Sequence, residues 1–174
     1  MARDAASEQE PGRESAEASL VRLGIELPTP LPPFGEYVPA VRSGNRLWVG
    51  GHFGTRADGT VHTGKVGAVV STDEARDAAR AAAVNLLATV RAELGSLDSV
   101  TRVVHVSGVV NAEPQFTEHT RVIDAASEVF VAVFGDRGRH ARLAFGVASL
   151  PDDLVLEIEA VIEIDGDAPI SSGR

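Results

Sequence analysis

The sequence predicts a single α+β domain in which two helices cover one face of a β-sheet. Its 174 residues are 44% hydrophobic and 24% charged, a composition that suits one globular domain with a substantial core. Two stretches, 71–94 and 117–134, repeat apolar residues at helical spacing. The segments before, between and after them have the alternation or the β-branched composition of strands.

The chain before the domain has a different character. Ser, Glu and Ala dominate positions 4–19, which indicates a disordered or weakly helical segment. Residues 1–33 are therefore expected to form a partly disordered extension. Its end, Pro28-Thr-Pro-Leu-Pro-Pro33, predicts a stiff, extended connector because proline fixes φ. We expect the domain to span residues 34–164, with a tail at 165–174. Deletion of residues 1–30 is therefore expected to cost the fold little.

The elements of the domain follow from local signals. Strands at 38–42 and 46–49 flank Ser43-Gly44-Asn45, which suits a tight hairpin turn. A short third strand is indicated around 60–62. Ser71 and Glu74 form a capping box that begins the first helix, and Gly95 ends it. Residues 102–110 indicate a mostly buried strand, and the second helix follows at 117–134.

The last two strands carry the clearest alternation. In 142–149 the bulky residues Leu143, Phe145 and Val147 alternate with small ones and with Arg142, and we expect the bulky set to lie under the helices. In 154–164 apolar residues alternate with acids, of which Glu157 is the first. Simple hairpin pairing of these strands would place Arg142 and Glu157 on the same face.

The second face of the sheet predicts an oligomer. Two helices cover one face only, and the other face mixes small and apolar side chains with the acids. Such a face is expected to be covered by another copy of the chain. The sequence therefore predicts a homo-oligomer.

Composition excludes several kinds of function. The chain has no cysteine, which removes disulfides, thiolate zinc sites and cysteine nucleophiles, and its five histidines have no ligand spacing, so no metal is expected. The net charge of −9 makes nucleic acid an unlikely partner. No apolar run is long enough to span a bilayer and no secretory signal is visible, so we expect no membrane contact and a cytoplasmic location. The glycines at 50–54 do not form a dinucleotide-binding motif, so binding of a dinucleotide is not expected.

Three residues are candidates for chemistry, each with an alternative. Arg142 could bind a carboxylate, or it could be a structural arginine, either paired with Glu157 or Glu159 or facing water at a strand end. Glu157 could hold and polarise a water, or it could be one of several solvated acids. His52, between glycines, could lie at a pocket wall or be an ordinary loop histidine. His105 is expected to be an interior side chain of a buried strand.

Two separate motifs resemble the RidA (YjgF) family. Residues 141–160, ARLAFGVASLPDDLVLEIEA, are similar to its C-terminal signature, in which an Arg is followed about eight residues later by Leu-Pro and then by a strand with E-[IV]-E. Residues 35–52, GEYVPAVRSGNRLWVGGH, resemble its P-Y-x-x-A-V-x-x-G-x-x-[LIV]-[FY]-x-S-G-Q. The similarity covers roughly residues 34–164, and the chain is identified as a member of this family.

The resemblance implies a chorismate-mutase-like α+β fold, with a mixed β-sheet, two helices on one face and three subunits joined into a homotrimeric barrel. Active members hydrolyse reactive 2-imino and 2-enamino acids to 2-oxo acids and ammonia, without a cofactor, in clefts between subunits. Their small-molecule substrate and the other copies of the chain are the implied partners.

Carried over by position, the family pattern assigns roles to several residues. Arg142 would bind the substrate carboxylate and Glu157 would orient the attacking water. Tyr37 would line the cleft and Gly51 would present backbone. His52 stands where the family commonly has Gln and Ser127 where it commonly has Asn, so both would change the lining, as would Leu143 and Ala144 after the arginine. The extended N-terminus resembles a less characterised branch, and a non-catalytic module that binds small carboxylates or a partner protein is the alternative.

Overall fold

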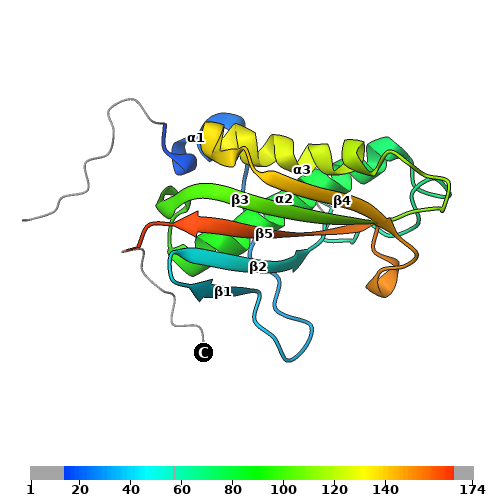
Figure 1. The fold of residues 1–174 in the computed structure, drawn as a ribbon, viewed down its shortest axis with the longest axis horizontal. Helices are drawn as coiled ribbons and strands as arrows, with labels where there is room; N and C mark the ends of the chain where they lie inside the picture. The colour runs from blue at the N-terminus through cyan, green and yellow to red at the C-terminus, as the bar shows by residue number, and fades with distance from the viewer. Residues whose placement is uncertain (1–13, 57, 167–174) are drawn as a thin grey trace, which may run out of the picture.

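The computed structural model describes residues 14–56 and 58–166, and in them one mixed sheet carries helices on one face (Figure 1). The strands lie in the order β1-β2-β5-β3-β4, and all neighbours are antiparallel except β3 and β4. In Figure 1 the sheet lies in front of the long helix α2, and α3 runs along its upper edge beside β4. The predicted α+β class is thereby confirmed. The elements are α1 Ala16–Leu23, β1 Ala40–Ser43, β2 Arg46–His52, α2 Thr72–Leu94, β3 Val100–Asn111, α3 His119–Phe134, β4 Ala141–Val147 and β5 Leu156–Ile164.

Local signals placed most of these elements correctly. The β1–β2 hairpin turns at Gly44, which has a positive φ of 60°. The capping box of Ser71 and Glu74 begins α2, and Gly95 closes it in the left-handed conformation. The alternation of β5 is also confirmed, because its apolar residues are buried under the helices while its acids face away. The segment expected as a third strand contributes only an isolated bridge, Thr55 with Val61.

The expected hairpin between β4 and β5 is wrong. β4 pairs in parallel with β3 at the edge of the sheet, and β5 lies at the centre between β2 and β3. Parallel neighbours need a crossover, which α3 provides between β3 and β4. The turn at 150–153 then carries the chain past β3, with Asp152 and Asp153 at positive φ. Turn length alone could not distinguish this path from a simple hairpin.

The expected orientation of β4 is also wrong. Leu143 and Phe145 are 52% and 42% exposed on the open face, whereas Arg142 and Gly146 lie on the side of α3. A side chain at Gly146 would collide with the His119 ring, so the small residues of β4 let α3 approach the sheet. Alternation identifies two faces but not which of them is covered.

The first helix, α1, belongs to the packed structure. Ala16 and Leu20 are 0% and 3% exposed and join the core, and α1 contacts α3. The Glu17 carboxylate accepts a hydrogen bond of 2.9 Å from the Leu97 backbone N–H. This packing contradicts the reason for expecting that deletion of residues 1–30 would cost the fold little. An eight-residue helix depends on tertiary contacts, which local sequence does not reveal. Positions 1–13 of the expected extension and 167–174 of the expected tail lie outside the described residues.

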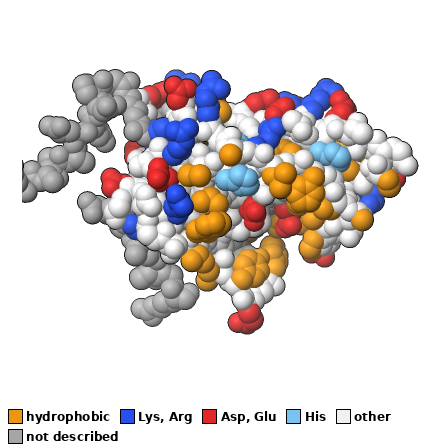
Figure 2. Space-filling view, in the orientation of Figure 1, with side chains coloured by type: hydrophobic (Ala, Val, Ile, Leu, Met, Phe, Trp, Pro, Cys, Tyr) orange, Lys and Arg blue, Asp and Glu red, His pale blue; other side chains and the backbone are white. Residues whose placement is uncertain are grey.

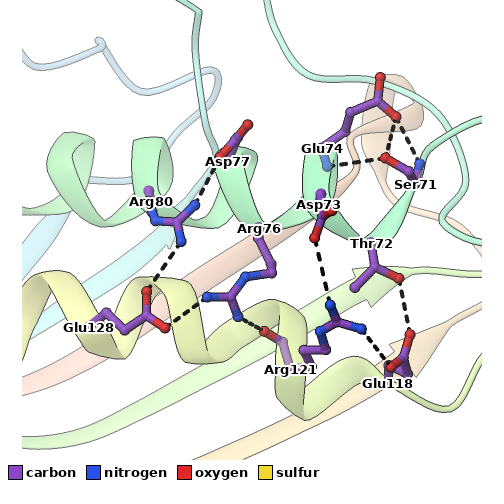
Figure 3. Close-up of polar contacts among 10 residues, drawn as sticks. All are labelled: Ser71, Thr72, Asp73, Glu74, Arg76, Asp77, Arg80, Glu118, Arg121 and Glu128. Atoms are coloured by element: carbon purple, nitrogen blue, oxygen red, sulfur yellow. Dashed lines mark hydrogen bonds and ion pairs between the residues drawn. The ribbon is translucent and has the colours of Figure 1, made fainter.

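The outer surface of the helix layer is charged. Glu128 of α3 accepts hydrogen bonds from Arg76 and Arg80 of α2 at 2.7 and 3.3 Å (Figure 3). Arg121 of α3 lies 3.0 Å from Glu118 and 3.8 Å from Asp73. Most of these side chains are exposed, so each pair contributes little stability. Charged side chains of this kind are well solvated, so this surface is stable in contact with water.

The open face of the sheet is different, because hydrophobic side chains gather on it (Figure 2). Val41, Trp48, Leu143 and Phe145 are between 42% and 53% exposed there. His105, expected in the interior, also lies on this face, in register with Trp48 through Val161. Among the described helices, none combines the length and the apolar character needed to cross a bilayer.

Candidate functional site

The six residues expected at the site fall into two groups. Tyr37, Gly51, His52 and Glu157 line one small pocket of about 60 Å³, beside the loop that precedes β1. Arg142 and Ser127 belong to a separate cluster between β4 and α3. The other residues of the pocket lining are Leu31, Pro32, Pro33, Phe34, Pro39, Gly50 and Phe53.

Glu157 is the charged group of the pocket. Its side chain projects from β5 against Gly51, where a Cβ would lie in ordinary van der Waals contact with Oε1, at 3.4 Å. Within the described part of the chain, Glu157 has no hydrogen-bond or ion-pair partner. Burial raises the pKa of its carboxyl above the ordinary value of 4.5. This carboxylate is therefore able to take up a proton from a bound molecule.

Tyr37 forms the outer wall of the pocket together with the end of the proline-rich connector. Its hydroxyl oxygen accepts a hydrogen bond of 3.2 Å from the Phe34 backbone N–H. The Phe34 ring lies 5.9 Å from that of Phe53, measured between centroids. Tyr37 and Phe34 are 55% and 74% exposed, so the wall is an open rim on this chain.

His52 lines the pocket, but both of its ring nitrogens are engaged within the chain. Nδ1 lies 2.8 Å from the Gly50 carbonyl oxygen, which only accepts, so Nδ1 carries the proton. Burial lowers the pKa of His52, and the bond to Gly50 opposes this only in part. The neutral ring then accepts at Nε2 from the Thr89 hydroxyl of α2, at 2.8 Å. His52 therefore positions the pocket wall and is not available as a base.

Arg142 is held by two side chains of α3. Its Nη1 donates to Asp124 Oδ1 at 2.6 Å and to Ser127 Oγ at 3.0 Å. The alternative pairing with Glu157 or Glu159 is absent, since the acid that Arg142 contacts is Asp124. Sequence reasoning missed Asp124. Its spacing of three residues from Ser127 on a predicted helix was the available signal that both point the same way.

His140 completes this cluster. Its Nδ1–H donates to the Gly138 carbonyl oxygen at 2.6 Å, and its Nε2 lies 3.0 Å from Ser127 Oγ. Burial is the main cause that lowers the pKa of His140, and the Arg142 charge lowers it further. The neutral ring therefore accepts from the Ser127 hydroxyl, which in turn accepts from Arg142. The serine fixes the guanidinium from the side of α3.

The outer edge of Arg142 remains available for a ligand. Only Nη1 makes hydrogen bonds among the described residues, which leaves Nε and Nη2 with three N–H groups. The side chain of Arg142 is 18% exposed and that of Asp124 is 48% exposed. An anion can therefore reach the guanidinium, although its charge is already paired.

One copy of the chain does not bring Arg142 and Glu157 together. β5 and β4 are separated by β3, and the register aligns Glu157 with Val109 and Phe145 on the open face. Arg142 points to the opposite side of β4, toward α3. The expected shared face is therefore wrong. Residues 14–56 and 58–166 contain no group of three or more His, Asp or Glu side chains that could hold a metal ion.

Comparisons with known proteins cover most of the chain. Residues 17–162 match the model of the YjgF/chorismate mutase-like family, whose description also carries an endoribonuclease label. Protein TCP17 of Trypanosoma cruzi is 42% identical over 149 residues, which cover 85% of this chain and 93% of that protein.

Solved structures are similar as well. A protein of unknown function from Agrobacterium tumefaciens is 42% identical, with a TM-score of 0.79 over 86% of this chain and 92% of that one. A Shewanella oneidensis protein with an endoribonuclease label is 27% identical, with a TM-score of 0.83 over 87% and 100% of the two chains. RidA from a Psychrobacter species is 26% identical, with a TM-score of 0.55 over 78% and 94%.

Proposed function

The chain belongs to the YjgF/RidA family, and from this premise we propose that it hydrolyses reactive 2-imino and 2-enamino acids to 2-oxo acids and ammonia. The observation that carries the proposal is the unpartnered, half-buried carboxylate of Glu157 in a pocket with Gly51 and Tyr37. An uncompensated acid with a raised pKa is typical of a group that exchanges protons during a reaction.

In the proposed reaction, water adds to C2 of the protonated imine and the nitrogen leaves as ammonium. The 2-iminium acid and one water give the 2-oxo acid and one ammonium ion, so atoms and charge balance. Glu157 accepts a proton from the attacking water as the C–O bond forms. It then returns the proton to the nitrogen and the C–N bond breaks as the C2 hydroxyl becomes the carbonyl group. The hydroxyl proton passes through Glu157 to the departing ammonia, which gives ammonium. Arg142 binds the substrate carboxylate through Nε and Nη2, which fixes C2 for attack.

The proposed site lies between copies of the chain, since Arg142 and Glu157 diverge within one copy. The Arg142 cluster of one copy would face the Glu157 pocket of the next, in a homotrimer whose sheets form a central barrel. The exposed apolar side chains of the open face support such an assembly, because their burial between copies is favourable.

A second candidate function is favoured by one observation. Arg142 is already neutralised by Asp124, which weakens its attraction for a substrate carboxylate. A protein that binds small polar metabolites or a partner protein, without catalysis, would not need Arg142 to bind a carboxylate more strongly. Cleavage of RNA receives less support, since the chain has a net charge of −9.

The test is an assay with freshly formed substrate. An amino-acid oxidase generates the imino acid, semicarbazide traps what remains, and the wild type should accelerate its disappearance. Glu157→Gln should reduce kcat by about 100-fold, a usual effect of removing a general base. Glu159→Gln is the matched control, because Glu159 lies on the same strand and face but is exposed. Wild-type inactivity on several imino acids would favour the binding function, and full activity of Glu157→Gln would refute the role of that carboxylate.

A further inference from the structure

The pairing of Asp124 with Arg142 has a second consequence, which concerns the form of the ligand. We propose that Asp124 and Arg142 together recognise a zwitterion, so that the site prefers the 2-iminium acid to the 2-oxo acid that it becomes. The inference rests on the proposed function and adds Asp124 as a specificity-determining residue.

The placement of Asp124 supports this role. It lies on α3 one turn before Ser127, and its Oδ1 accepts from Arg142 Nη1 at 2.6 Å. Its side chain is 48% exposed, whereas that of Arg142 is 18% exposed, so the carboxylate stands at the open side of the pair. Both charges can therefore be reached by one small molecule.

A structural role alone does not account for Asp124. Ser127 and the β4 backbone already hold Arg142, and Ser127 is itself fixed by His140. An ion pair with a half-exposed member adds little to stability. Asp124 does change the charge of the cluster, because it cancels the cation that would otherwise attract any carboxylate.

The two ligand forms differ at a single atom. A 2-iminium acid carries a carboxylate and a positively charged N–H group on adjacent carbons, whereas the 2-oxo acid carries only the carboxylate. Arg142 Nε and Nη2 can donate to the carboxylate in both. Asp124 accepts a hydrogen bond from the iminium nitrogen of the substrate, but it meets the carbonyl oxygen of the product without a proton to bind. The Asp124–Arg142 pair, which has no net charge, is thus complementary to a zwitterion, and its carboxylate repels an anion.

This preference would favour turnover. After hydrolysis the cationic nitrogen has left as ammonium, so Asp124 loses its partner on the ligand. The product then competes with Asp124 for the guanidinium and dissociates more readily. Weak product inhibition is the expected sign.

The experiment compares two stable probes by calorimetry at pH 7. L-2-aminobutyrate carries both charges, and 2-oxobutyrate carries only the carboxylate. The wild type should bind 2-aminobutyrate more tightly. Asp124→Asn should lower the affinity for 2-aminobutyrate and raise the affinity for 2-oxobutyrate. Each change should be about fivefold, as expected for one partly exposed charge contact. Asp124→Glu should keep the wild-type order of the two affinities.

The matched control is Asp136→Asn, which removes the same charge from an exposed acid that pairs with Arg139. It should leave the ratio of the two affinities unchanged. Circular dichroism spectra of all variants establish that they fold. If both probes bind and Asp124→Asn leaves their ratio as in the wild type, the inference is overturned while the proposed function stands. If neither probe binds the wild type, the carboxylate site and the proposed function fail together.

Discussion

The Glu157 pocket and the Arg142 cluster differ in how the chain treats their charge. Glu157 has no cation within the described residues, and burial raises its pKa. Arg142 has an acid, a serine and, through the serine, a histidine around it. An unpaired carboxylate is chemically reactive toward protons, whereas a paired guanidinium is fixed in place. The difference teaches that the two groups are suited to different tasks, proton transfer for Glu157 and ligand positioning for Arg142.

The largest expected effect concerns the positioning group. Arg142→Ala should weaken binding of 2-oxobutyrate by about 100-fold, since it removes charge-assisted hydrogen bonds to the carboxylate. Calorimetry measures the affinity, and sedimentation should show the same oligomer as the wild type. Arg139→Ala is the control, because Arg139 is 71% exposed and pairs locally with Asp136. Unchanged affinity in Arg142→Ala would remove the guanidinium from the site.

A mixed assembly tests whether the two groups meet between copies. Arg142→Ala and Glu157→Gln should each retain little activity alone, but co-expression lets an intact Arg142 of one copy face an intact Glu157 of the next. In a randomly mixed trimer about a quarter of the sites are complete, so about a quarter of wild-type activity should return. The variants mixed after folding, without subunit exchange, are the control. Inactive mixed trimers would mean that both groups act within one copy or not at all.

How far the sequence predicted these regions depends on the range of the signals. The capping box at Ser71 and the alternation of β5 are local, and both predictions are confirmed. The orientation of β4 depends on how closely α3 approaches, which Gly108 and Gly146 permit: a Cβ at Gly108 would lie 2.6 Å from Ile123. That approach is a tertiary property, so alternation alone chose the wrong face.

The same limit applies to the site. The resemblance grouped Tyr37, Gly51 and Glu157, and they do line one pocket. Asp124 was missed because it lies 18 positions before Arg142 along the chain and on a different element. An acid on a helix is an ordinary surface residue until the strand beneath it is known. The divergence of Arg142 from Glu157 likewise required the strand order.

The pH dependence of the reaction sharpens the assignment of Glu157. The carboxylate must be ionised to accept a proton, so kcat/KM should fall tenfold per pH unit on the acid side of its pKa. Because burial raises this pKa, that limb should lie above pH 4.5. Burial lowers the pKa values of His52 and His140, so both rings are neutral at pH 6.5 and above. Neither histidine should therefore add a second fall in kcat/KM near pH 6.5. An acid limb at or below pH 4.5 in the wild type would contradict a raised pKa.

The smallest expected effect is on stability, and it separates a reactive acid from a structural one. A folded-state pKa above the unfolded value means that folding favours the protonated carboxyl, so ionised Glu157 costs stability. Below the unfolded pKa the carboxyl is protonated in both states and Glu157 does not reduce the free energy of unfolding. As the pH rises through the folded pKa, the ionised carboxylate lowers the free energy of unfolding of the wild type. Glu157→Gln should therefore raise Tm by about 1–3 °C at pH 7.5 and have no effect below pH 4.

Thermal unfolding of the two proteins at both pH values measures this difference. Glu159→Gln, at the exposed acid of the same face, should change Tm at neither pH. A reduced Tm of Glu157→Gln at pH 7.5 would mean that the carboxylate stabilises the fold through a partner. The contrast between the two groups would then disappear, and with it the reason to regard Glu157 as the proton acceptor. A raised Tm together with lost activity is the combination that only a functional, uncompensated acid explains.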